Sequence, residues 1–353
     1  MPDSTVTAGR AALIKRLFPA GIPKLWCPLL THYREGGVID GPRIEAHLRH
    51  LAPWVSSFLI PGSTGDGWVL GPERTQQLIE LALDLAEPLG LNLLIGVLKP
   101  DAAEMIGALK NLSGQIQQRT GEADPLKALA KARVSGFTLC PPRGQAEPEI
   151  AAALASALET GLPIALYQLP QVTQNEISPE LAADLAARFE NFIFFKDTSG
   201  TDRVVLSGKP LGGVFTVRGS EGNYERWLDQ AGGPYHGFLL STANCFAREL
   251  RQIIEQVANR QIDTARQLAQ RLTTVIERGF ELTRTLPAGN PFANANKAID
   301  HFFAYGHGAA KVPPPRLYTG DRLPVELLAA VEQLLKEQDL LPAEGYLVDQ
   351  PAE

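Results

Sequence analysis

Eight short apolar runs recur along the chain, each about the length of a β-strand. The lengths of these runs suit strands buried on both faces. Helix-length amphipathic segments separate the runs, and the clearest helix start is Ser178-Pro179-Glu180, where a hydroxyl N-cap precedes a proline. The eight runs are residues 25–31, 57–63, 92–98, 136–141, 163–169, 192–197, 215–219 and 237–242.

This alternation of strands and helices predicts an α/β fold, the closed (β/α)8 TIM barrel. Consecutive parallel strands need crossover helices, and eight of them can close without leaving an edge. The alternative is an open doubly wound sheet. The fingerprints of nucleotide-binding open sheets, G-x-G-x-x-G after the first strand and G-x-x-x-x-G-K-[ST] anywhere, are absent from the sequence, which favours the barrel. A polar stretch at residues 114–124 is interpreted as an insertion in the third crossover.

After the eighth run the sequence becomes mostly helical. We expect tail helices near residues 246–256, 262–278, 293–305 and 325–338, the last three packing as an appendage. The predicted organisation is a helical lead-in over residues 1–22, a barrel over residues 23–256 and a C-terminal helical appendage over residues 257–353.

Charge and cysteine content argue against several classes of protein. The formal net charge is -6 and the basic residues are scattered among acidic ones, so nucleic acid is not an expected partner. Cys27, Cys140 and Cys245 lie far apart and form no C-x-x-C, so a reducing cytoplasmic setting fits better than a disulfide framework or a zinc knuckle. No apolar run approaches the ~20 residues that cross a bilayer, and residues 8–18 lack the features of a signal peptide. We therefore expect a soluble cytoplasmic protein with no membrane partner.

In a barrel of this kind the reacting groups lie at the carboxyl ends of the strands and in the loops that follow them. Lys196 closes the apolar run that begins at Phe192. If it points inward, poor solvation disfavours its ammonium form and yields the free amine that attacks a ketone. The alternative is an ion pair with a neighbouring carboxylate such as Asp197. Lys99 is the competing amine, but Pro100 follows it, which is typical of an exposed loop.

Two further strand ends carry groups suited to binding a carbonyl or an anion. Tyr167 ends a buried run, and its phenol can donate to and accept from a carbinolamine oxygen or a carboxylate; a packed tyrosine is the alternative. Gly-Ser-Thr-Gly-Asp at residues 62–66 offers main-chain N–H groups and hydroxyls to an anion, or else forms a plain tight turn. His32 is the only histidine expected at these strand ends, so no metal site is predicted.

These residues resemble motifs of the dihydrodipicolinate synthase and N-acetylneuraminate lyase superfamily of class I aldolases and dehydratases. Residues 62–66 match the family's Gly-[Ser/Thr]-Thr-Gly-Glu, residues 167–170 match Tyr-Asn-x-Pro, and residues 196–200 read Lys-Asp-Thr-Ser-Gly. Asn290-Pro291 in the tail is a further match, and the resemblance runs from about residue 23 to about residue 341. It implies a barrel enzyme that forms a Schiff base with a small 2-oxo acid such as pyruvate.

By this resemblance three residues would be catalytic. Lys196 would be the Schiff-base lysine, Tyr167 the proton relay that contacts the carbinolamine, and Ser63 the hydroxyl that links this relay. The backbone of residues 62–66 would hold the substrate carboxylate, and a glycine after the seventh strand would leave room beside the ketoacid. The residues implied to bind substrate are Thr64, Gly65, Thr198, Gly219, Glu221 and Leu239. No cofactor and no metal are implied.

The sequence departs from dihydrodipicolinate synthase itself at several positions. Val172 stands where that enzyme places a carboxylate-binding arginine, and Pro142 and Arg143 stand where it has a pair of tyrosines. Arg143 and Arg218 remain as candidates for binding a second carboxylate. Asp66 replaces the family's glutamate. We therefore do not expect a true dihydrodipicolinate synthase.

Two classes of function remain open. The first is a lyase that cleaves or condenses a pyruvate-type substrate, or dehydrates a 2-keto-3-deoxy acid, through Lys196. The second is a catalytically inactive barrel that serves as a binding or regulatory protein, and the missing tyrosine and arginine motivate it. The resemblance also implies a homo-oligomer, either a dimer or a tetramer.

Overall fold

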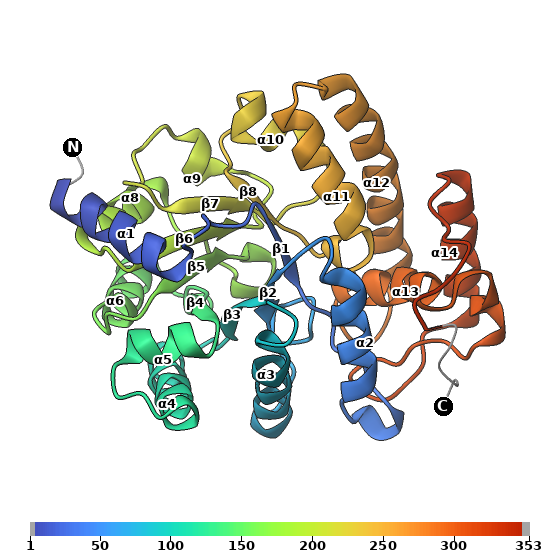
Figure 1. Cartoon of the computed structure of the whole chain (residues 1–353), viewed down its shortest axis with the longest axis horizontal. Coiled ribbons are helices and arrows are strands. Elements are labelled where there is room, and N and C mark those ends of the chain that lie inside the picture. The colour runs from blue at the N-terminus through green and yellow to red at the C-terminus, as the bar shows by residue number, and fades with distance from the viewer. Residues whose placement is uncertain (1–3, 348–353) are drawn as a thin grey trace. The chain divides into compact units, whose positions relative to one another are not determined.

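The computed structural model describes residues 4–347, and its sheet is a closed barrel in the order β1 to β8 (Figure 1). The predicted TIM barrel is confirmed. Most strands end before the corresponding apolar run does, because the last residues of the run turn into the loop. The strands are β1 (Leu25–Pro28), β2 (Ser57–Ile60), β3 (Asn92–Val97), β4 (Val134–Leu139), β5 (Ile164–Gln168), β6 (Phe192–Asp197), β7 (Phe215–Arg218) and β8 (Gly237–Leu239).

The strands are buried on both faces, as the short apolar runs predict. Every residue of β2, β4, β5 and β6 is buried. A polar residue in such a strand needs an internal partner or a function, because neither face offers water. Lys196 and Asp197, at the end of β6, are residues of this kind.

Helices follow the strands and continue after β8, and the four predicted tail helices correspond to α11, α12, α13 and α14 (Figure 1). Of these, α12, α13 and α14 contact one another. The helices are α1 (Ser4–Leu17), α2 (Gly41–Leu51), α3 (Pro72–Ala86), α4 (Ala102–Thr120), α5 (Pro125–Lys131), α6 (Glu147–Leu158), α7 (Pro170–Thr173), α8 (Pro179–Arg188), α9 (Arg203–Leu206), α10 (Tyr224–Trp227), α11 (Ala243–Ala258), α12 (Ile262–Thr283), α13 (Pro291–Tyr305) and α14 (Val325–Glu337). Short 3-10 segments are η1 (Glu35–Gly37), η2 (Asp229–Ala231) and η3 (Gly306–Lys311).

Local signals explain where two of these helices begin or end. Helix α8 starts as predicted, because Ser178 Oγ accepts from the Leu181 amide at 3.0 Å and Pro179 occupies the first turn. Helix α4 continues through most of the polar stretch and stops at Gly121, whose φ of 70° is left-handed. Because α5 follows at once, the extra length of the third crossover is helical.

The chain forms two compact units, which are described separately. The first contains Leu91–Ser220, Trp227–Leu239 and the residues up to Lys24; the second contains Leu25–Gly90, Glu221–Arg226 and the residues from Leu240 onward. The domain boundaries expected at residues 22 and 256 remain a prediction. Among the helices of residues 4–347, none is both long and apolar enough to cross a bilayer.

In the first unit, helix α1 is fixed by a buried arginine. Arg10 is 0% exposed. Its guanidinium donates to the carbonyl oxygens of Ala186 at 2.5 Å, Phe189 at 2.7 Å, Phe192 at 2.7 Å and also Gly212. These bonds satisfy carbonyl groups at the end of α8 and the start of β6, the strand that carries Lys196.

Replacing Arg10 with methionine is expected to lower the free energy of unfolding by about 3 kcal/mol, because several buried carbonyl groups lose their donor. Urea unfolding followed by circular dichroism measures the loss. Arg16→Met is the matched control on the same helix, since the Arg16 side chain is 44% exposed, and it should cost less than about 0.5 kcal/mol. Equal destabilisation by the two substitutions would contradict the role given to Arg10.

Candidate active site

Lys196 and Tyr167 lie side by side in neighbouring parallel strands of the first unit. They are register partners in β6 and β5, and Lys196 Nζ lies 3.9 Å from the centroid of the Tyr167 ring. The two residues are 3% and 2% exposed, so the amine has lost most of its contact with water. The structure therefore brings together an amine and a phenol at the strand ends where the sequence predicts them.

Asp197, the alternative partner of Lys196, forms bonds with other residues. Successive side chains of a strand point to opposite faces, and Asp197 Oδ1 accepts from the Ser199 amide at 2.9 Å and from Gln168 Nε2 at 3.3 Å. Burial raises the pKa of the Asp197 carboxyl, and the bonds from Ser199 oppose this shift. The Asp197 carboxylate is therefore bonded to the loop after β6 and to β5.

Gly219, which follows β7, leaves room for the Lys196 side chain. A Cβ atom at Gly219 would lie 2.8 Å from Lys196 Cε and 3.2 Å from the Asp197 carbonyl oxygen, and it would also meet the Thr198 hydroxyl. The first of these distances is well inside the ~3.5 Å of a normal contact between carbon atoms. The Gly219 amide donates to the Asp197 carbonyl at 2.6 Å, which fixes the glycine in place.

Cys140 lies in the same buried region as the Lys196 amine. Cys140 follows β4 and is 0% exposed. Burial raises the pKa of its thiol, and the charge of Lys196 opposes this shift. Cys140 and Lys196 therefore share a poorly hydrated environment.

In the second unit, residues 62–66 form a tight turn directly after β2. The Gly65 and Gly67 amides both donate to the Gly62 carbonyl, at 3.1 and 3.0 Å. A Cβ atom at Gly65 would lie 2.5 Å from the Leu29 carbonyl oxygen, so this position requires glycine. The Asp66 amide donates to the Ser63 carbonyl at 3.2 Å. Within residues 62–66 the amides of Gly65 and Asp66 are therefore engaged in the turn.

Ser63 is bonded to two residues that sequence reasoning gave no role. Trp68 Nε1 donates to Ser63 Oγ at 2.8 Å, and Asn290 Nδ2 donates to the Ser63 carbonyl at 2.9 Å. Asn290 also caps α13, because its Oδ1 accepts from the Ala293 amide at 2.8 Å. The Asn290-Pro291 motif therefore begins α13 and holds the loop. A hydroxyl that accepts one bond can also donate one, so the bond from Trp68 is compatible with a relay role for Ser63.

Asp66 is part of a buried ion pair. Lys297 Nζ, on α13, lies 2.6 Å from Asp66 Oδ2, and both side chains are 1% exposed. The Tyr33 hydroxyl donates to the same oxygen at 3.0 Å. Burial, together with the charge of Asp66, raises the pKa of Tyr33. The carboxylate that replaces the family's glutamate therefore fastens the loop to α13 and to Tyr33.

Glu221, expected to contact substrate, is bonded within the second unit. Its Oε1 accepts from Ser241 Oγ at 2.7 Å and from the Thr242 amide at 3.1 Å, and its Oε2 accepts from the Tyr224 hydroxyl at 3.0 Å. A carboxylate has about four acceptor sites, so one remains for a ligand at most. Leu239, the last residue of β8, is 1% exposed.

Arg218 is held in a buried cluster of the first unit. Its Nε and Nη2 atoms donate to the two carboxylate oxygens of Asp202 at 3.1 and 3.2 Å, and its Nη1 donates to the Ser220 carbonyl at 2.7 Å. The guanidinium also lies 4.1 Å from the Trp227 ring centroid. Of the two arginines that remained for a second carboxylate, Arg218 is therefore engaged within the protein, whereas Arg143 is exposed.

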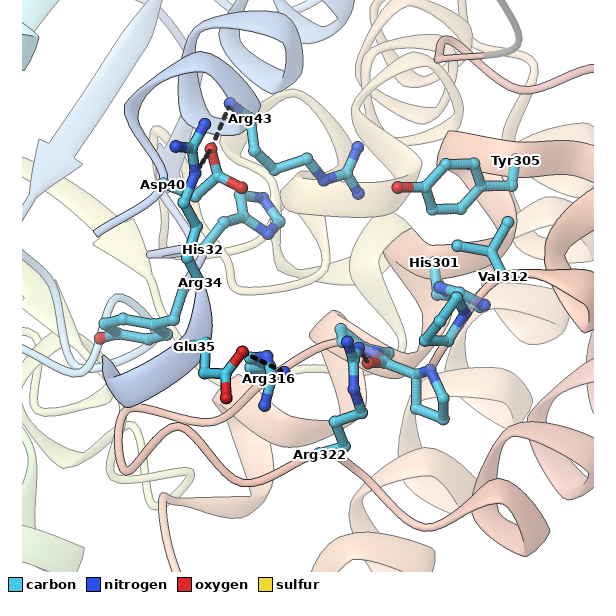
Figure 2. Close-up of a pocket in the computed structure, with 14 residues that line it drawn as sticks. His32, Arg34, Glu35, Asp40, Arg43, His301, Tyr305, Val312, Arg316 and Arg322 are labelled. Atoms are coloured by element: carbon cyan, nitrogen blue, oxygen red, sulfur yellow. Dashed lines mark hydrogen bonds and ion pairs between the residues drawn. The ribbon is translucent and has the colours of Figure 1, made fainter. Parts of the chain in front are cut away.

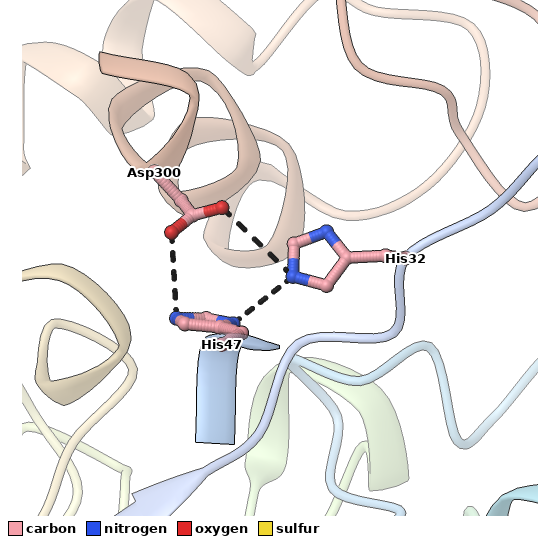
Figure 3. Close-up of side chains that lie close together, drawn as sticks. All are labelled: His32, His47 and Asp300. Atoms are coloured by element: carbon pink, nitrogen blue, oxygen red, sulfur yellow. Dashed lines mark hydrogen bonds and ion pairs between the residues drawn. The ribbon is translucent and has the colours of Figure 1, made fainter. Parts of the chain in front are cut away.

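The structure gives His32 partners that the sequence did not indicate. His32 lines a cavity in the second unit (Figure 2). Its Nε2 lies 3.0 Å from His47 Nδ1, and His47 Nε2 lies 3.4 Å from Asp300 Oδ1 (Figure 3). The three side chains offer ligand atoms within 4.8 Å of one another, which is close enough to hold a metal ion. Sequence reasoning missed this group because Asp300 belongs to the distant helix α13.

The surroundings of these three residues favour a hydrogen-bond network over a cation. Asp300 already accepts from Arg43 Nη2 at 2.6 Å and from the Tyr346 hydroxyl at 2.9 Å. Burial lowers the pKa of His32 well below its usual value, and the charges of Arg43 and Lys297 lower it further. A divalent cation would be repelled by these same positive charges.

The sequence model of the Dihydrodipicolinate synthetase family matches residues 151–289, a segment that includes Tyr167, Lys196 and Gly219. The resemblance to this family is confirmed. The 4-hydroxy-tetrahydrodipicolinate synthase of Erythrobacter litoralis is 25% identical over 267 residues, which are 72% of this chain and 81% of the relative. This low identity agrees with the departures from dihydrodipicolinate synthase at Val172 and Pro142.

Two solved structures share the fold. A prophage protein of the dihydrodipicolinic acid synthase family from Escherichia coli, in complex with pyruvate, has a TM-score of 0.69 and 21% identity, covering 90% of this chain and 98% of its own. A 2-keto-3-deoxygluconate aldolase from Sulfolobus has a TM-score of 0.68 and 17% identity, covering 89% and 96%. At these identities the likeness shows the barrel fold.

Proposed function

We propose that this protein is a lyase that forms a Schiff base between Lys196 and a small 2-oxo acid of the pyruvate type. The observation that carries the proposal is the buried contact between Lys196 Nζ and the Tyr167 ring, at 3.9 Å. A neutral amine attacks the ketone carbon to give a carbinolamine, which loses water to form the imine. The Tyr167 hydroxyl is suited to carry the protons of this step.

The imine determines the class of reaction. It withdraws electrons from C3, so a carbanion at C3 becomes an enamine. Breaking or forming the bond between C3 and C4 passes through this enamine. Loss of water across C3 and C4 passes through it as well. The complex of one structural relative with pyruvate and the aldolase activity of another support a 2-oxo acid as the substrate.

The proposed carboxylate site is the turn at residues 62–66. Because the turn itself engages the Gly65 amide, we propose Thr64 as the residue of this turn that binds the substrate carboxylate, and we keep Ser63 as the proposed relay hydroxyl. Thr198 Oγ1 is buried and has no hydrogen-bond partner within residues 4–347, so we assign it to a substrate hydroxyl. Gly65, Gly219, Glu221 and Leu239 stay proposed as further residues that bind substrate.

A long substrate with a second carboxylate is not favoured. Val172 offers no charge where dihydrodipicolinate synthase has an arginine. Of the two candidate arginines, Arg218 is paired with Asp202, and Arg143 is exposed to solvent. A buried carboxylate without a cationic partner is costly. The proposal therefore favours aldol chemistry or dehydration of an uncharged arm over dihydrodipicolinate synthesis.

Trapping with pyruvate and borohydride, followed by peptide mass spectrometry, tests the proposal. Borohydride reduces the imine to a stable secondary amine, and the adduct is expected on Lys196. Lys196→Met should abolish the adduct, whereas Lys99→Met, which removes the competing strand-end lysine, should leave it unchanged. An intact wild-type protein that forms no adduct at millimolar pyruvate would instead support the inactive binding barrel.

A further inference from the structure

A cavity of about 410 Å³ lies in the second unit, lined by the segment after β1 and by the end of α13 with the segment after it. Its volume is typical of small-molecule sites. Val312 and the prolines at 313–315 give it an apolar wall. Four arginines line it, namely Arg34, Arg43, Arg316 and Arg322 (Figure 2).

The positive charge of the cavity is only partly neutralised. Arg316 Nη2 lies 3.9 Å from Glu35 Oε2, and the Glu35 side chain is 92% exposed, so this pair is weak. Arg34 Nε lies 3.4 Å from Asp40 Oδ1. Burial and the charge of Arg316 lower the pKa of Arg322. Arg316 and Arg322 both stay charged at neutral pH, so two like charges lie close together at the cavity.

Arg43 carries a donor that lacks an acceptor. Its Nη2 pairs with Asp300 at 2.6 Å, but its Nη1 is buried and has no hydrogen-bond partner in the described part of the chain. The guanidinium lies 5.0 Å from the Tyr346 ring and 5.6 Å from the Tyr305 ring, which hold its orientation. A buried N–H group without an acceptor is costly, and an oxygen atom of a ligand would supply one.

We propose that this cavity binds a small organic oxyanion with two negative charges, either a phosphate monoester or a dicarboxylate. Among residues 4–347, four guanidinium groups and two carboxylates line the cavity, an excess of two positive charges (4 − 2), or of one when Asp300, the partner of Arg43, is included (4 − 3). Arginine binds both kinds of oxyanion through paired hydrogen bonds. Val312 and the prolines contact the uncharged part of the ligand.

The proposed site adjoins residues that hold the loop at 62–66. Tyr33 lines the cavity and donates to Asp66 in that loop at 3.0 Å. A ligand in the cavity would therefore lie beside Tyr33, which is bonded to this loop. The proposal goes beyond the Schiff-base function and does not rest on it, since Lys196 is not among the lining residues.

Calorimetric titration of the full chain tests this site with inorganic phosphate, glycerol phosphate and succinate, and with glycerol as the uncharged control. We expect one-site binding of at least one dianion and no binding of glycerol. Arg34→Met and Arg322→Met should each weaken binding about tenfold or more. Both side chains are exposed, so these variants should keep the wild-type melting temperature. Arg278→Met, which removes an exposed arginine bonded to Glu281, should bind as the wild type does.

The outcomes separate the two chemistries and the two proposals. Binding of glycerol phosphate alone assigns a phosphate monoester, and binding of succinate alone assigns a dicarboxylate; either supports the site. The site is overturned if the folded protein binds none of the dianions, or if Arg278→Met weakens binding as much as Arg322→Met does. Lys196→Met should bind the dianion normally, so a failed pyruvate trap leaves this result unaffected.

Discussion

Gly219→Ala is expected to slow the capture of pyruvate by Lys196 by about 100-fold while the barrel stays folded. The added Cβ atom would lie 2.8 Å from Lys196 Cε. The Thr198 hydroxyl, which the Cβ atom would also meet, and the flexible lysine must both move, so the amine leaves its position beside Tyr167. A displacement of about 1 Å is enough to cost two orders of magnitude in rate.

The rate of borohydride-trapped adduct formation measures this effect, with circular dichroism and the melting temperature as tests of folding. Gly114→Ala is the matched control, because Gly114 lies in α4 and, apart from the nearby backbone of that helix, no atom of residues 4–347 stands within 4 Å of a Cβ atom there. The control should react at the wild-type rate. If Gly219→Ala traps pyruvate as fast as the wild type, Lys196 does not react from the position beside Gly219.

The barrel was predictable because its strands are buried on both faces. A short run rich in apolar residues then marks each strand, and the run at residues 192–197 coincides with β6. The other ends were less predictable, since apolar residues such as Leu29 and Leu30 continue past the last residue of β1. These residues are buried as part of a loop, and their hydrophobicity alone does not distinguish a loop from a strand.

The pair of Lys196 and Tyr167 followed from strand order alone. Consecutive strands of a parallel barrel are neighbours, so groups at their carboxyl ends meet. Asp66 and Lys297 have no such relation: they are 231 residues apart in sequence, and a helix of the tail joins them. Contacts of this kind depend on how the tail packs, which no local pattern encodes.

Glu221 and Arg218 show a second limit of sequence reasoning. Arg218 ends β7 and Glu221 follows it. A charged side chain at this end of a barrel strand is expected to face a ligand. In the structure Glu221 accepts three hydrogen bonds from protein groups, and Arg218 pairs with Asp202. A motif identifies the residue type at a position. It does not identify the protein groups that pair with that residue's charge.

Asp66→Asn is expected to lower the free energy of unfolding by about 3–5 kcal/mol, because it leaves the Lys297 ammonium buried without a counter-charge. The asparagine can still accept from Tyr33, so the loss of charge is the main change. Lys297→Met should be comparably destabilising, because it leaves the Asp66 carboxylate unpaired. The double variant should be more stable than Asp66→Asn alone, since no unpaired buried charge remains.

Urea unfolding of the four proteins gives the coupling energy of the pair, expected at about 2 kcal/mol or more. The matched control cycle is Arg278→Met with Glu281→Gln, an ion pair at 2.5 Å whose side chains are 63% and 52% exposed, and its coupling should stay under about 1 kcal/mol. A coupling between Asp66 and Lys297 as small as that of the control would mean that the buried pair does not hold the loop. The bond from Asn290 to the Ser63 carbonyl would then be the principal link between the loop and α13.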